Sequence, residues 1–109
     1  MSNGSTLPAG QPLLLHSLIS PTAQGIASRI LAKAAGGSAT LFAFDAGQGL
    51  TEHTSPFDAL VMVLEGVLTV TVNGASVQAA PGTIVRMPAS VPHAVDAPAA
   101  ARMLLIMLK

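Results

Sequence analysis

The sequence predicts one all-β domain of the sandwich or barrel type. Three observations support this class. Short apolar segments recur along the 109 residues, turn-forming residues separate them at short intervals, and no segment has a convincing helical pattern. About eight to ten strands follow from this spacing. We expect residues 1–11, which are rich in Ser, Gly and Pro, to form a flexible arm, and residues 12–109 to form the domain.

The first third of the chain carries competing local signals. Residues 12–20 are compatible with a short strand or with an extension of the arm. Residues 25–35 have apolar side chains at helical spacing and also in alternation. Their alanine content favours a helix, but we expect a strand because the rest of the chain has β character. Two adjacent glycines then predict a turn, and residues 38–45 predict a strand with aromatic side chains on one face.

Stronger turn signals separate the remaining strands. We expect these strands at residues 50–53, 60–64, 67–72, 75–79, 83–87, 91–97 and 102–108. Between two of them, Asn73 and Gly74 predict a two-residue hairpin turn because both residues tolerate positive φ. The segment 60–64 is apolar on both faces, which is typical of a strand buried between two layers.

Composition and charge exclude several kinds of partner. The net charge is zero and the five basic residues are scattered, so no basic patch is available for a phosphate backbone. Three phenylalanines are too few for a base-stacking platform, and we expect no nucleic acid partner. The apolar runs are far too short to span a membrane, and the first residues lack the cationic region of a secretion signal. We therefore expect a cytoplasmic protein with no membrane partner.

The same composition bears on metal chemistry and assembly. The chain has no cysteine, which excludes disulfides, thiolate nucleophiles and cysteine-bound metals. It is 50% hydrophobic and only 9% charged. A high alanine content explains this imbalance, and apolar surface buried between two subunits explains it equally well. We expect a homodimer.

Two segments carry a histidine among regularly spaced glycines and prolines. The first runs from Gly47 through His53 to Gly66, and the second runs from Gly82 through Pro88 to His93. This pattern resembles the two half-motifs of the cupin family, of the small cupin 2 or RmlC-like kind, over about residues 36–108. The resemblance implies a double-stranded β-helix, or jelly-roll barrel, in which histidines from separate strands meet at a metal.

The ligand set that the resemblance implies is incomplete. The position of the second histidine holds Ser55, and the position of the glutamate holds Ala59. Two imidazoles alone bind a transition metal weakly. Asp58, next to the missing glutamate, is the carboxylate that would complete a two-histidine, one-carboxylate triad. The candidate metal ligands are therefore His53, His93 and Asp58.

Each candidate also has a plain structural interpretation. The alternative for the histidines is a hydrogen-bonded pair inside a barrel. For Asp58 it is an exposed turn residue, and for Ser55 it is a turn shaped with the following proline. A bound metal would be a divalent transition ion such as zinc, iron, nickel or manganese, although two histidines suit zinc, iron, copper and nickel alike. Without a metal, His53, Ser55 and His93 define a pocket for an anionic or carbonyl-bearing small molecule, and either histidine is a candidate general base.

Three functions are compatible with these patterns. The first is binding of a small molecule, with or without a divalent metal. The second, implied by the resemblance, is a metal-dependent enzyme of the dioxygenase, isomerase or decarboxylase type. The third is a metal-free dimeric structural or interaction module.

No glycine-rich phosphate motif leads into a helix, so we expect no nucleotide cofactor. The methionines at 62, 87, 103 and 107 are candidates for a soft pocket lining, although core filling is their usual role. The sequence identifies no substrate and no catalytic residue.

Overall fold

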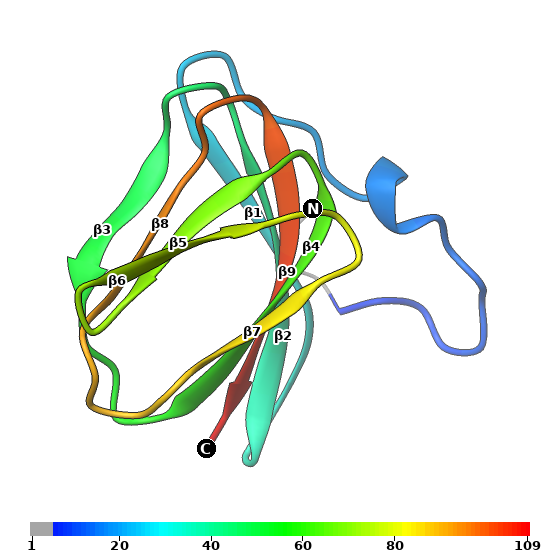
Figure 1. Ribbon diagram of the computed structural model, residues 1–109. Helices are drawn as coiled ribbons and strands as arrows, with labels where there is room; N and C mark the ends of the chain where they lie inside the picture. Colours follow the sequence, from blue (N-terminus) through cyan, green and yellow to red (C-terminus); the bar gives the residue numbers. More distant parts are fainter. Residues whose placement is uncertain (1–5) are drawn as a thin grey trace.

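Two antiparallel β-sheets lie face to face in the computed structural model, which describes residues 6–109 (Figure 1). One sheet has five strands in the order β1-β2-β9-β4-β7, and the other has four strands in the order β3-β8-β5-β6. Neighbouring strands are often distant in sequence, as β2 and β9 are, and every pairing is antiparallel. This is the predicted jelly-roll barrel.

The strands lie close to their predicted positions. They are β1 (Ile26–Ala34), β2 (Gly37–Phe44), β3 (Gly49–His53), β4 (Asp58–Glu65), β5 (Leu68–Val72), β6 (Ala75–Ala79), β7 (Ile84–Met87), β8 (His93–Asp96) and β9 (Ala101–Leu108). Residues 12–20 form no strand and contain instead a short 3-10 helix, η1 (Leu15–Ser17). No helix in the described part of the chain is long and apolar enough to cross a membrane.

Strand β1 shows that residues 25–35 are extended and not helical. It pairs with β2 from Ile26 to Ala34, with one irregularity between Ile30 and Ala32. Pairing and burial decide β-structure more strongly than intrinsic preference does. The hydrogen bonds to β2 therefore outweigh the helical preference of the alanines in this segment.

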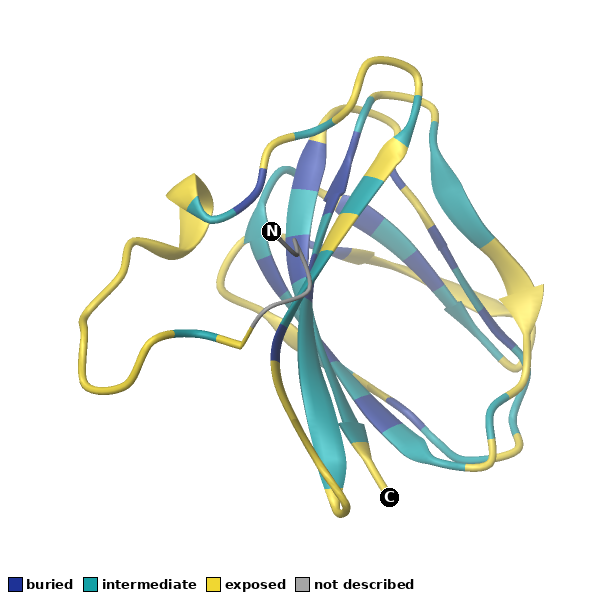
Figure 2. Ribbon diagram, turned by 180° about the vertical axis from the view of Figure 1, so that it is seen from behind, coloured by how far each residue is buried: buried dark blue, intermediate teal, exposed yellow. Residues whose placement is uncertain are grey.

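The interior between the sheets is filled by side chains that alternate along each strand. On β4, Ala59, Val61 and Val63 are buried, while the residues between them are only partly buried. Figure 2 shows buried positions, in dark blue, on strands of both sheets. The core between the sheets contains Phe44, Ala59, Val61, Val63, Leu68, Val70, Ala79, Met87, Val95, Ala97, Ala101 and Met103. Each large side chain in this set stabilises the fold by about 1.5–3 kcal/mol through removal from water.

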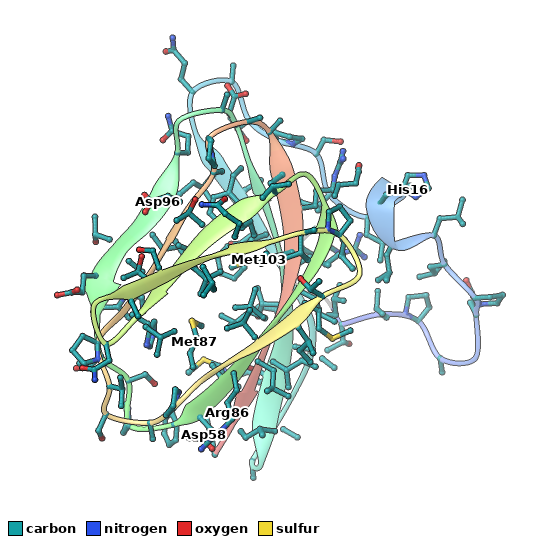
Figure 3. All side chains as sticks on the ribbon, in the orientation of Figure 1. His16, Asp58, Arg86, Met87, Asp96 and Met103 are labelled. Atoms are coloured by element: carbon teal, nitrogen blue, oxygen red, sulfur yellow. The ribbon has the colours of Figure 1, made fainter. Side chains whose placement is uncertain are left out.

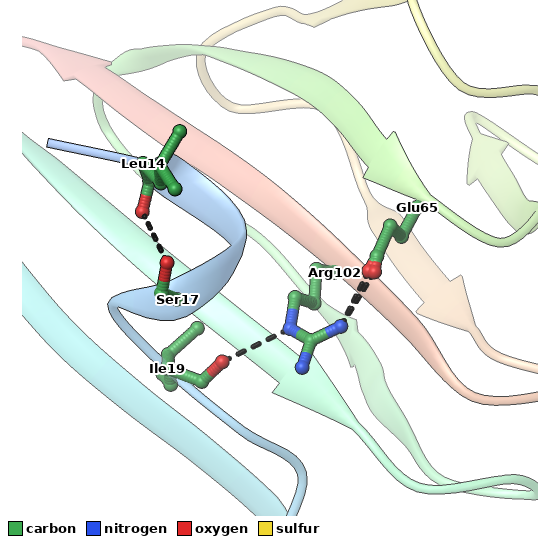
Figure 4. Close-up of polar contacts among 5 residues, drawn as sticks. All are labelled: Leu14, Ser17, Ile19, Glu65 and Arg102. Atoms are coloured by element: carbon green, nitrogen blue, oxygen red, sulfur yellow. Dashed lines mark hydrogen bonds and ion pairs between the residues drawn. The ribbon is translucent and has the colours of Figure 1, made fainter.

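A second, smaller cluster lies on the outer face of the five-stranded sheet, where the N-terminal segment crosses it. This cluster contains Ile19, Leu31, Leu41 and Ala43. Arg102 anchors the crossing: its Nε donates to the carbonyl of Ile19 at 2.9 Å, and its Nη1 donates to Glu65 at 2.6 Å (Figure 4). The guanidinium therefore joins the segment to β9 and β4 at once.

The stretch before η1 stands away from the barrel (Figure 1). Leu13, Leu14 and Leu15 are consecutive and remain 37%, 68% and 41% exposed. Residues 1–5 of the predicted arm lie outside the described residues. At the other end of the segment, the N–H of Leu7 donates to the carbonyl of Leu31 at 2.9 Å, which ties the chain back to β1.

The glycines at 66 and 47 provide a test of the packing around β9. Both have positive φ, of +70° and +83° respectively. A Cβ on Gly66 would lie 2.4 Å from the carbonyl oxygen of Ala100, whereas a Cβ on Gly47 would meet nothing within 4 Å. We expect Gly47→Ala to lower the free energy of unfolding by about 1–2 kcal/mol through backbone strain alone. Gly66→Ala should cost more, because the backbone before β9 must also move. Urea denaturation measures both losses, and equal values would contradict the close contact.

Candidate functional site

The fold brings together the two histidines of the sequence motifs. His53 ends β3 and His93 begins β8, and the two residues pair directly in the antiparallel register. Directly paired residues project from the same face of a sheet, so both imidazoles point the same way. Their ring centroids lie 4.4 Å apart with an interplanar angle of 72°.

Backbone carbonyls determine which nitrogen of each imidazole carries hydrogen. The Nδ1 of His53 lies 2.7 Å from the carbonyl oxygen of Thr51, and the Nδ1 of His93 lies 3.1 Å from that of Val91. A carbonyl oxygen only accepts hydrogen bonds, so each Nδ1 is the donor and each neutral ring presents a lone pair at Nε2. The two Nε2 atoms are 3.1 Å apart. Facing lone pairs repel, so a cation or a hydrogen-bond donor bound beside them would satisfy both nitrogens.

The histidine pair lies at one end of a small apolar cavity. His93 is only 4% exposed, whereas His53 is exposed, so solvent reaches the pair from the side of β3. The cavity has a volume of about 50 Å³ and is lined by Leu50, His53, Ser55, Ala59, Met87, His93, Val95, Met103, Leu105 and Met107. Drug-sized ligands occupy cavities of roughly 300–1,000 Å³. This cavity therefore suits an ion or a molecule of a few atoms.

Ser55 lines the cavity but also shapes the loop between β3 and β4. Its Oγ accepts the N–H of Phe57 at 3.2 Å, and its carbonyl oxygen accepts the N–H of Ser90 at 2.7 Å. Short side-chain bonds of this type stabilise turns. The structure thus places Ser55 beside the pocket with its hydroxyl already engaged by the backbone.

Asp58 is not brought to the histidines. It lies on the outer face of β4, opposite to the face on which its neighbour Ala59 lines the cavity. Its Oδ2 accepts from Nη2 of Arg86 at 3.1 Å and from Nε at 3.3 Å, and its Oδ1 accepts the N–H of Ala89 at 2.8 Å. Figure 3 shows Asp58 and Arg86 together at the lower edge of the barrel. The sequence prediction of Asp58 as the third ligand is not retained, because both oxygens are engaged away from the pocket.

The environment of Asp58 makes stability depend on pH. The N–H of Ala89, and then the guanidinium of Arg86, hold the pKa of Asp58 below its ordinary value of 3.8. A lowered carboxyl pKa contributes stability that is present above the unfolded-state value and is lost as the pH falls through the folded-state value. We expect the wild type to exceed Asp58→Asn in free energy of unfolding at neutral pH, and this advantage to vanish in acid. Urea titrations across this pH range measure it, and a pH-independent gap would contradict the assignment.

The donor set does not fit the divalent metal that the motifs imply. Among residues 6–109, no cluster of three or more His, Cys, Asp and Glu side chains is placed to hold a metal ion. The pocket offers two imidazoles, a hydroxyl engaged in a turn and otherwise apolar side chains. A divalent transition ion is ordinarily held by three or four nitrogen, oxygen or thiolate donors. No reaction step through such an ion follows from this geometry.

Methionines that the sequence offered as candidate lining residues do line the cavity. Met87 on β7 and Met107 on β9 are the direct cross-strand partners of Ala59 on β4, and all three residues line the cavity. The sequence signal for these positions was the alternation of inward-facing and outward-facing side chains along β7 and β9. Met103 also lines the cavity, whereas Met62 lies on the outer side of β4, so the predicted methionine lining holds for three of the four residues.

Comparison with known proteins identifies the family. The family model described as the cupin domain matches residues 40–108, more than half of the chain, so the protein belongs to the cupin family. This family includes metal-binding enzymes. No protein with a curated description matches the chain.

Solved structures agree with this assignment. A conserved protein of unknown function from Streptococcus pyogenes is 32% identical, with a TM-score of 0.90, and the match covers 100% of this chain and 96% of that one. A cupin superfamily protein from Desulfitobacterium hafniense is 28% identical, with a TM-score of 0.88 and 98% of both chains covered. A cupin 2 conserved barrel domain protein from Leptotrichia buccalis is 32% identical, with a TM-score of 0.82, over 86% of this chain and 46% of that one.

Proposed function

We propose that the protein is a small-ligand-binding cupin whose binding site is the His53–His93 pair and the cavity beneath it. The observation that carries this proposal is the 3.1 Å approach of the two Nε2 atoms at the mouth of an otherwise apolar cavity. A bound cation, or a hydrogen-bond donor on an anionic or carbonyl-bearing molecule, would satisfy both lone pairs directly. The cavity volume of about 50 Å³ limits the ligand to an ion or a few atoms.

Binding is better supported than metal-dependent catalysis. General acid–base chemistry needs a second group that orients the histidine or exchanges a proton with the substrate. Of the candidates predicted from the sequence, Asp58 is engaged with Arg86, and Ser55 is a neutral hydroxyl whose Oγ accepts the N–H of Phe57. The imidazoles are oriented by backbone carbonyls alone. Within residues 6–109, this arrangement orients both rings and supplies them with no acidic partner.

The binding proposal can be tested by thermal unfolding in the presence of small probes. Acetate, oxalate and inorganic phosphate serve as anion probes, and Zn(II), Ni(II) and Mn(II) serve as cation probes. We expect at least one probe to raise Tm of the wild type in a concentration-dependent way, since a ligand that binds only the folded state stabilises it. The double variant His53→Ala/His93→Ala should lose this increase. His16→Ala is the matched control, because His16 is exposed on η1 away from the barrel (Figure 3). An equal increase in the double variant would rule out the histidine pair as the site.

We further propose that two copies associate through the outer face of the five-stranded sheet. Its apolar side chains include the exposed Ile84 and Leu108 and the half-buried Leu60, Met62 and Ile106. These residues are neighbours, because Leu60 pairs with Ile106, and Met62 pairs with Ile84. The exposed leucines of residues 13–15 precede the segment that covers the adjoining part of the same face. A contiguous apolar patch on a protein surface is typical of an interaction site.

A second copy of the chain is the partner that suits this face. The charged residues at its edge, Asp58 and Arg86, have opposite signs, and their side chains are 36% and 62% exposed. Across a two-fold axis the same patch meets itself, so each acidic group can approach the basic group of the other copy. The chain also has zero net charge, so two copies do not repel each other strongly.

Ile84 provides a test of this dimer. It is 57% exposed on β7, and a charge in its place would be buried in the proposed interface. We expect Ile84→Glu to shift the protein from dimer to monomer in light scattering at micromolar concentration. Val77→Glu is the matched control, since Val77 is 49% exposed on β6 of the other sheet and should leave the mass unchanged. A monomeric wild type, or a dimer in Ile84→Glu, would overturn the proposed interface.

A further inference from the structure

We infer that the pocket is a soft-cation site that takes Cu(I) in preference to a divalent metal. This inference deepens the proposed binding function and rests on it. It starts from the mismatch described above, in which the carboxylate and further imidazoles of a divalent site are missing. Ser55 and Ala59 occupy those positions, and methionines line the cavity beside them. Thioether sulfur changes the kind of metal that the pocket selects.

Two rows of side chains from opposite sheets line this cavity. The four-stranded sheet contributes His53 and His93, which are directly paired on β3 and β8. The five-stranded sheet contributes Met87 and Met107, which flank Ala59 on either side. Ala59 is the shortest of these side chains, so it leaves room between the two methionines. Figure 3 shows Met87 directed into the interior of the barrel.

The chemistry of these donors favours a soft monovalent ion. Imidazole nitrogen binds many transition metals, but thioether sulfur selects Cu(I) among the common ones. The ion must also enter a mostly apolar cavity with no carboxylate among its lining residues. Burial of an uncompensated charge is costly, and a dication costs more than a monocation. Cu(I) carries a single charge and accepts few donors, so it incurs the smaller penalty.

The distance between the imidazoles leaves space for sulfur ligands. Two nitrogens that each lie about 2.0 Å from one ion and 3.1 Å from each other subtend an angle of about 100° at that ion. This angle is bent, so further ligands can approach from the cavity side. The Nδ1 hydrogen bonds to the carbonyls of Thr51 and Val91 keep both Nε2 lone pairs available. The cavity of about 50 Å³ holds an ion with little accompanying water.

Anaerobic competition against a chromogenic Cu(I) chelator tests the inference on the full chain. We expect one Cu(I) ion to bind per chain and the double variant His53→Ala/His93→Ala to lose this binding. Zn(II) at equal concentration should not displace Cu(I). Met87→Leu and Met107→Leu keep side-chain volume while removing sulfur. Each should weaken Cu(I) binding by about tenfold or more, because even partners outside the first coordination shell have effects of that size. Met62→Leu is the matched control and should bind as the wild type does, since Met62 lies on the outer side of β4.

X-ray absorption of the copper-loaded protein provides a second measurement that does not depend on affinity. We expect the wild type to show scattering from sulfur bound to copper, and Met87→Leu and Met107→Leu to show less of it. The Tm of each metal-free variant should stay close to that of the wild type. Cu(I) bound without sulfur, or Zn(II) bound more tightly, would overturn the soft-cation site. If the pocket binds an anion or a divalent ion through the histidines but no Cu(I), this inference fails while the proposed binding function stands. If neither the binding of the small probes nor the binding of Cu(I) depends on the histidines, both this inference and the proposed binding function fail.

Discussion

The alternation of side chains along β4 and β9 is the constraint on which the rest of this structure depends. Ala59, Val61 and Val63 face the interior, so Asp58, Leu60 and Met62 face outward. A shift of one residue in register would exchange these two sets. Such a shift would bring the Asp58 carboxylate towards the histidines, but it would also move three apolar side chains out of the core. The apolar core therefore keeps the carboxylate outside, and the interior position beside the histidines belongs to alanine and its methionine neighbours.

The histidine pair depends on the same kind of constraint in the other sheet. His53 and His93 meet because the β3–β8 register sets them opposite each other, and the backbone carbonyls of Thr51 and Val91 then orient both rings. The backbone thus takes the role that carboxylates often have in orienting a histidine. The result is a pair of nitrogen lone pairs beside an apolar cavity, which favours the binding of a positive ion or of a hydrogen-bond donor. Nothing in this arrangement depends on the missing ligands of the family motif.

The outer face of the five-stranded sheet shows how one surface is divided between two roles. The N-terminal segment covers one part, where Ile19 is buried and Arg102 anchors the crossing. The remainder keeps an apolar row on β4, β7 and β9. Covering this row with a second copy would account for the low charged fraction of the chain. The division also explains why residues 12–20 form no strand. Their contacts, through side chains and the carbonyl of Ile19, are with the outer face of a sheet, whereas a strand would have to pair with a strand edge.

The sequence by itself determined the barrel and the identity of the histidine pair. The signals for them are local: alternating apolar segments, the Asn73-Gly74 hairpin and the two glycine–proline motifs. Local signals can be recognised without knowing which strands pair. The tertiary structure alone decided which side chains share the cavity. Asp58 and Ala59 are adjacent in sequence, and the irregular Ser55-Pro56 loop before them conceals which one faces inward. Met87 and Met107 lie far apart in sequence and meet Ala59 only through pairing across three strands. The register between distant strands is set by burial of the whole core, and no local pattern encodes it.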